Sequence, residues 1–99
     1  MMDHLPLIER IAIEGYVGYH SGHPLRAWEL ISAHERERWL AAAASEALTP
    51  RALRQAYYDE TRIKPTSWAD LPSKSRERWK HAWEGMHRER VKVAKGGRA

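Results

Sequence analysis

A repeat at an offset of 40 residues limits the fold of this chain more than any other feature. Trp28 recurs as Trp68, and Arg36-Glu37-Arg38-Trp39 recurs as Arg76-Glu77-Arg78-Trp79, with no gap in the alignment. A period of this length is typical of chains built from repeated helical units. The sequence therefore predicts an all-α protein: a small helical bundle of about four main helices, built from two tandem helix-loop-helix units of about 40 residues.

The first unit, residues 5–48, contains signals for two helices. Apolar residues at helical spacing predict a helix from Pro6 to Tyr19, and the Gly- and Pro-containing segment 20–24 ends it. A short helical turn follows. Ser32 and Glu35 then have the form of a capping box, in which each side chain accepts from a free backbone amide. We therefore expect a second helix from there to about Leu48.

The second unit, residues 49–93, repeats this organisation. Thr49-Pro50 is a good helix start, because a hydroxyl can cap the helix and proline lacks an N–H that would be unpaired anyway. We expect one helix over residues 50–62 and a last one with Pro72 in its first turn. The whole chain is predicted to be one domain over residues 1–95, with a flexible tail at 96–99. Whether the two units share a core or stack as neighbours stays open at this stage.

Charge and composition limit the class of protein. The net charge is +4, and residues 74–99 carry nine Lys or Arg against three Glu, so the basic character lies at the C-terminal end. Cysteine is absent, so disulfides and thiolate zinc sites are excluded. No cationic start followed by an apolar run is present, which predicts a cytoplasmic protein without a membrane segment.

Motifs for catalysis or cofactor binding are missing from the sequence. His20 and His23 have a spacing that metal sites use, but no second pair of ligands stands nearby in the sequence. The six His have no Ser, Cys or carboxylate partner in a motif, and the glycines do not follow a strand as in a phosphate-binding loop. We therefore predict a protein that is not an enzyme and that holds no metal or cofactor.

Arginine and lysine side chains are the candidate partner-binding residues. These candidates are Arg36, Arg38, Arg76, Arg78, Arg88, Lys92 and Lys95. The first four belong to the repeated motif, where they either form a recognition surface or cover the adjacent Trp with their stems. The last three form a basic stripe at i, i+4 and i+7 that suits a phosphate backbone, although Glu84 and Glu89 dilute it.

The Trp pattern resembles small accessory proteins encoded by phages and prophages. Many of these carry an aromatic-rich helix, a Gly/Pro loop, a Trp-x2-Leu-type turn and an Arg-x2-Trp followed by alanines. In the first half the matching segments are Tyr16-Val17-Gly18-Tyr19, Gly22-His23-Pro24-Leu25, Trp28, Arg36 and Trp39-Leu40-Ala41-Ala42-Ala43. In the second half they are Ala56-Tyr57-Tyr58, Trp68-Ala69-Asp70-Leu71-Pro72, Arg76 and Trp79. This resemblance implies a protein that binds and blocks a host protein, including components of defence systems.

A second, local resemblance is to the HMG box. The last helix of that family follows a Trp-x2-Leu turn and carries an aromatic residue eleven positions after the Trp, as Trp68, Leu71 and Trp79 do here. The basic N-terminal strand and the long second helix of the family are missing, which puts minor-groove binding in doubt.

We therefore expect a non-enzymatic helical protein of phage or mobile-element type that binds and blocks a host macromolecule. A host protein or protein complex is the favoured partner, and an anti-defence, anti-CRISPR-like inhibitor is the sharpest form of this expectation. The alternative is a small DNA-binding protein that uses its basic C-terminal helix. The oligomeric state cannot be deduced from the sequence.

Overall fold

The protein is all-helical in the computed structural model, which describes residues 6–59 and 66–96, with side chains described as far as Lys92. The elements are α1 (Leu7–Tyr19), the short 3-10 turn η2 (Trp28–Leu30), α2 (Ala33–Ala44), α3 (Pro50–Asp59), the 3-10 turn η3 (Trp68–Asp70) and α4 (Ser73–Gly96). The predicted small helical bundle is confirmed. No helix in the described ranges is long and apolar enough to cross a membrane.

The predicted helix starts rest on hydroxyl caps that the structure contains. The Ser32 hydroxyl accepts from the backbone N–H of Glu35 at 3.1 Å, and the Thr49 hydroxyl accepts from that of Ala52 at 3.1 Å. The predicted end of α2 at Leu48 is wrong, because the helix stops at Ala44. Glu46 has a φ of 53°, and this left-handed conformation cannot continue a right-handed helix.

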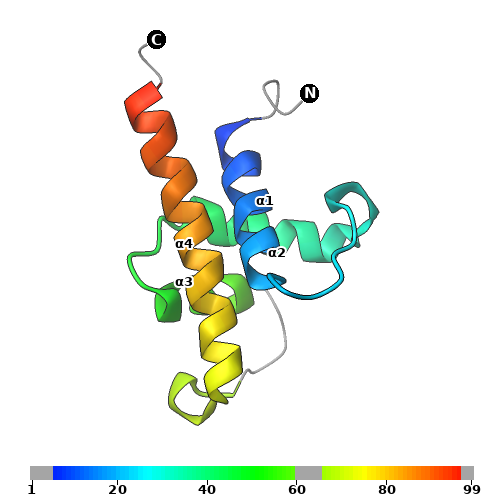
Figure 1. The fold of residues 1–99 in the computed structure, drawn as a ribbon, viewed down its shortest axis with the longest axis vertical. Helices are drawn as coiled ribbons and strands as arrows, with labels where there is room; N and C mark the ends of the chain where they lie inside the picture. Colours follow the sequence, from blue (N-terminus) through cyan, green and yellow to red (C-terminus); the bar gives the residue numbers. More distant parts are fainter. Residues whose placement is uncertain (1–5, 60–65, 97–99) are drawn as a thin grey trace.

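The final helix is the longest element in the described part of the chain, where it covers 24 residues. It includes Gly96, which we predicted as the first residue of the flexible tail, while residues 97–99 lie outside the described part of the chain. The predicted end of the third helix, in residues 60–62, also lies outside it. Figure 1 shows α4 running antiparallel to α1, with α2 and α3 crossing behind them.

Glycines allow α1 and α4 to approach closely, and these two helices make the most extensive helix–helix contact. A Cβ on Gly18 would lie 2.4 Å from the carbonyl oxygen of His81, and a Cβ on Gly85 would lie 2.6 Å from that of Glu14. Both distances are shorter than non-bonded atoms tolerate. The backbones can therefore pack this tightly only where no side chain is present.

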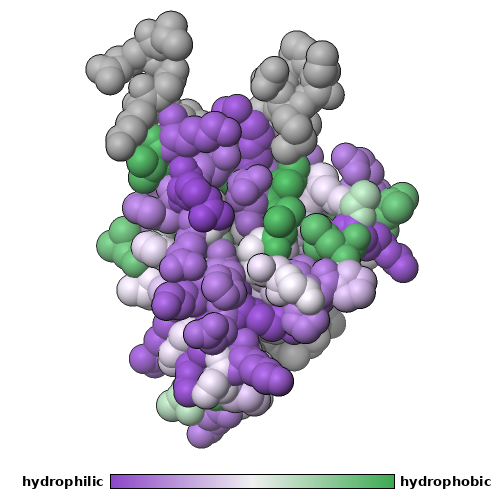
Figure 2. Space-filling model, viewed as in Figure 1, coloured by the Kyte–Doolittle hydropathy of each residue, from purple (hydrophilic) through white to green (hydrophobic). Residues whose placement is uncertain are grey.

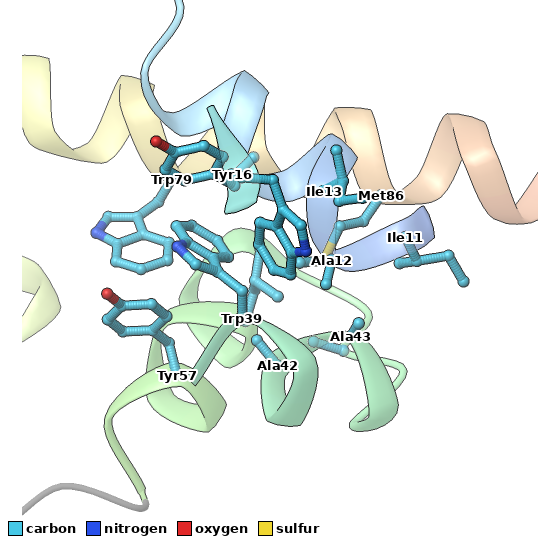
Figure 3. Packing of buried hydrophobic residues seen from close by; sticks show 14 of the residues in the cluster. Ile11, Ala12, Ile13, Tyr16, Trp39, Ala42, Ala43, Tyr57, Trp79 and Met86 are labelled. Carbon is cyan, nitrogen blue, oxygen red and sulfur yellow. The ribbon is translucent and has the colours of Figure 1, made fainter. Parts of the chain in front are cut away.

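The two units share a single core, which answers the question that the sequence left open. The rings of Trp39 and Trp79 meet with their centroids 5.6 Å apart, and Tyr57 lies within 5.2 Å of both rings. Figure 3 shows these three rings gathered on one side of the core, with the aliphatic side chains of Ile11 and Met86 on the other side. The repeated Trp of each unit therefore packs against the repeated Trp of the other.

Equivalent contacts run in both directions between the units. The guanidinium of Arg38, in the first unit, lies 5.7 Å from the ring centroid of Tyr57 in the second. The guanidinium of Arg78, in the second unit, lies 4.2 Å from the ring centroid of Tyr19 in the first. The fold therefore resembles a dimer of two units joined into one chain.

Candidate interaction surfaces

The arginines of the repeated motif make several contacts inside the fold. One guanidinium nitrogen of Arg36 donates to the carbonyls of Trp28, Glu29 and Ile31 at 3.3, 3.2 and 2.8 Å. It thereby ties the start of α2 to η2. Arg76, its counterpart, has one comparable contact, 3.5 Å to the carbonyl of Ala69. Arg76 is therefore less firmly held than Arg36.

The second pair of repeated arginines contacts the other unit. Arg78 donates from Nε to the carbonyl of Tyr19 at 2.9 Å and stacks over that tyrosine ring. Arg38 lies over Tyr57 in the equivalent way. Both side chains are half-buried, so they hold the two units together and leave little surface for a partner.

The predicted basic stripe lies on the outer face of α4. Arg88 and Lys92 are exposed, and Lys95 lies in the same helix with its side chain outside the described ones. Arg90, which the sequence analysis did not select, turns inward and donates to the carbonyl of Ala43 at 2.7 Å. Burial lowers the pKa of Arg90 from its ordinary value. The structure therefore separates the cations of this segment into exposed and inward-facing ones.

The α2–α3 corner is attached to the middle of α4. The indole N–H of Trp83 donates to the carbonyl of Ala47 at 2.9 Å, and the ring stacks on His87 with a centroid separation of 4.9 Å. Next to Ala47, Leu48 is 86% exposed. Figure 2 shows scattered hydrophobic side chains on a face where α4 is covered mainly by hydrophilic ones. Single exposed leucines are common on monomeric proteins, so Leu48 alone identifies no site.

His20 and His23 are not brought together with further metal ligands. Nδ1 of His20 lies 3.3 Å from a guanidinium nitrogen of Arg78, and because a guanidinium only donates, this nitrogen must accept. Burial and Arg78 lower the pKa of His20, and the carboxylate of Glu35 opposes them. Among the described residues, no three His, Asp or Glu side chains are close enough to hold a metal ion.

A hollow of about 430 Å³ separates the loop after α1 from the start of α4. Ser21, His23 and His81 line it, but no hydrogen bond joins a Ser to a His within the described side chains. His81 lies instead beside two carboxylates of its own helix, 3.8 Å from Glu77 and 3.4 Å from Glu84. The hollow therefore lacks the nucleophile and base geometry that acyl-transfer enzymes use.

The two repeated tryptophans before the long helices differ in their exposure. Trp28 is only 8% exposed, and its indole N–H donates to the Glu9 carboxylate at 3.1 Å. Trp68 is half-buried, and its indole N–H has no acceptor among the described residues. It borders a groove of about 290 Å³, which we call the Trp68 groove. The groove is lined by Pro50, Trp68, Ser73, Arg76, Glu77 and Lys80.

In the sequence, Trp68 stands out only through the repeat and the two resemblances, and neither it nor Lys80 is among the predicted binding residues. The repeat gave no reason to treat the two tryptophans differently, because both stand eleven residues before a Trp in the same motif. The two tryptophans differ in what the preceding helix places beside them: α1 contributes Glu9 to Trp28, whereas α3 begins at Pro50, which lines the groove next to Trp68. Comparison with known proteins adds no further information: no protein-family model matches the chain, and neither the curated proteins nor the solved structures include a significant match.

Proposed function

We propose that this chain is a non-enzymatic helical binding protein of phage or mobile-element type, which binds a host protein and blocks it. The observation that carries this proposal is the Trp68 groove. A half-buried Trp stands there beside Arg76 and the exposed Lys80, whereas the equivalent Trp28 is buried. Trp and Arg are the residues that most often dominate the energy of protein interfaces.

The pattern of arginine contacts supports the same proposal. Arg36, Arg38 and Arg78 are engaged within the fold, so Arg76 is the motif arginine best placed to meet a partner. The resemblance to small phage accessory proteins favours a host protein as the target, and a component of a defence system in particular. The groove is also small, which suits an anchor side chain or a short segment of a larger protein surface.

Affinity capture from a host lysate tests the proposal when the lysate is treated with nuclease. We expect the wild type to retain a protein that Lys80→Glu loses, because this change reverses a charge in the groove. Lys74→Glu is the matched control, since Lys74 is exposed on the same helix but does not line the groove. Capture that disappears with nuclease, or that both variants retain, would contradict the proposal.

DNA binding remains the second candidate, because Arg88 and Lys92 are exposed on the outer face of α4. At a rise of 1.5 Å per residue, they lie about 12–24 Å along the helix from Arg76 and Lys80 in the Trp68 groove. If the stripe binds duplex DNA through three phosphates, log affinity should fall with log salt at a slope of about −3. Changing Arg88, Lys92 and Lys95 together to Glu should then abolish binding, and tight duplex binding at physiological salt would favour this function over the first.

A further inference from the structure

The first unit shows what covers a tryptophan at this position of the fold. The first turns of α1 pass beside Trp28, and Glu9 from these turns accepts the indole N–H at 3.1 Å. The ring is buried as a result. In the first unit, the tryptophan at this position is therefore covered by a helical turn that carries a carboxylate.

Residues 49–59 and 66–93 of the second unit, the part that the structure describes, contain no equivalent turn. In the first unit the Tyr16 hydroxyl donates to the carbonyl of Arg26, and in the second the Arg54 guanidinium donates to the carbonyl of Thr66. Because Thr66 follows Arg26 by the repeat offset of 40, Arg54 occupies the place of Tyr16, which lies 38 residues earlier.

This correspondence shows that α3 begins later in its unit than α1 does. Pro50, the first residue of α3, stands where Ala12 stands in α1, so no helix among the described residues of the second unit replaces the part of α1 that begins at Leu7. Pro50 itself lines the Trp68 groove. The groove is therefore the space that a helical turn fills in the first unit.

The charges around the groove are suited to an acidic occupant. Among the described residues that line it, Arg76 and Lys80 are accompanied by a single carboxylate, that of Glu77. Arg36, the counterpart of Arg76, has three carbonyl acceptors, whereas Arg76 has one contact at 3.5 Å. Arg76 therefore retains donors for a further carboxylate, and such charge-assisted bonds are among the stronger hydrogen bonds in proteins.

We propose that the Trp68 groove binds an acidic helical turn of the partner protein, whose carboxylate accepts the indole N–H of Trp68 as Glu9 accepts that of Trp28. This inference rests on the proposed protein-binding function and specifies the chemistry of the partner. Arg76 and Lys80 flank the same carboxylate. Pro50 and the face of the indole contact the apolar side of the turn.

A helix-stabilised peptide of residues 6–14 of this chain tests the proposal, because it carries the turn that covers Trp28. The full-length protein is labelled with ¹⁵N, and the Trp68→Phe variant identifies the Trp68 indole N–H signal. We expect this signal to shift progressively with the peptide, with a Kd on the order of 1 mM. A peptide in which Glu9 is replaced by Gln should bind about tenfold more weakly, because it offers no charged acceptor.

Two protein variants and one further ligand complete the test. Lys80→Glu should weaken binding of the peptide several-fold, and Lys74→Glu should leave it unchanged. A Trp68 signal that does not respond to the peptide, or that responds equally to the Gln peptide, would overturn the proposal. A response to a short single-stranded oligonucleotide, but not to the peptide, would also overturn it.

The outcome is separable from that of the proposed function. If the lysate yields a protein whose capture depends on Lys80 while the peptide fails, the acidic-turn inference is wrong and the binding function stands. If the peptide binds as expected but the nuclease-treated lysate yields no such protein, the chemistry of the groove stands and the proposed function is wrong.

Discussion

Replacing Gly85 by Ala in α4 tests the close approach of α1 and α4. In an isolated helix this change is favourable, because Ala exceeds Gly in helix propensity by about 1 kcal/mol. In the folded protein the new Cβ would lie 2.6 Å from the carbonyl oxygen of Glu14, which belongs to the backbone of α1 and cannot rotate away. The two helices must therefore separate by several tenths of an ångström along the most extensive helix contact in the fold.

The expected magnitude follows from these opposing effects. Overpacking a well-packed core usually costs about 1–3 kcal/mol, and we expect the upper part of that range, about 2–3 kcal/mol, at Gly85 because the Cβ meets backbone rather than a movable side chain. The gain of about 1 kcal/mol in helix propensity offsets part of this strain. We expect a net loss of about 1–2 kcal/mol in the free energy of unfolding, or a decrease of roughly 4–16 °C in Tm for a domain of this size.

Urea denaturation followed by far-UV circular dichroism measures this loss. Arg88→Ala and Arg88→Gly provide the control, because the pair reports the difference between Ala and Gly at an exposed position of the same helix. A Gly85→Ala variant that is as stable as the wild type, or more stable, would refute the reasoning.

Three further predictions concern the core, pH and metals. Trp79→Ala should lower the free energy of unfolding in urea by about 3–5 kcal/mol, because this ring is buried. Trp68→Ala should lower it clearly less, because that ring is half-buried, and equal losses would contradict the packing. Burial and Arg78 lower the pKa of His20 in the folded state, so the unfolded chain binds a proton at this residue more readily than the folded chain does. The contribution of His20 to stability is therefore complete above about pH 6.5 and decreases as the pH falls below it. Comparing the wild type with His20→Gln across that range measures this contribution, and parallel pH profiles would contradict it. A chelator should leave Tm unchanged, and a Tm that drops and recovers with zinc would contradict the prediction that the protein needs no metal.

The helix content and the two-unit organisation could be predicted from the sequence because their signals are local. The repeated Trp positions lie at helical spacing from other apolar residues, and the hydroxyls of Ser32 and Thr49 precede α2 and α3 as caps. The shared core could not be predicted, because the spacing within one unit contains no information about the neighbour of Trp39. It took the structure to show that this neighbour is Trp79.

The Trp68 groove could not be predicted from the sequence, because the first helices of the two units do not follow the repeat offset. The repeat offset is constant in the second helix of each unit but differs in the first, where Arg54 takes the place of Tyr16. The sequence pattern matches the segment 16–19 with the segment 56–58 without a register, whereas the structure pairs Tyr19 with Tyr57 through equivalent arginine contacts. Without the correct register, the missing turn over the Trp68 groove could not be recognised.

Hydrogen exchange of the two indole N–H groups tests the central claim most directly. In the wild type, the N–H of Trp28 is hydrogen-bonded to Glu9 in a buried position, whereas Trp68 is half-buried, lines an open groove and has no indole acceptor among the described residues. We predict that the indole proton of Trp68 exchanges with solvent at least about tenfold faster than that of Trp28, because exchange without local unfolding requires access to water. Equal protection of the two protons would show that the groove is closed and would contradict the account.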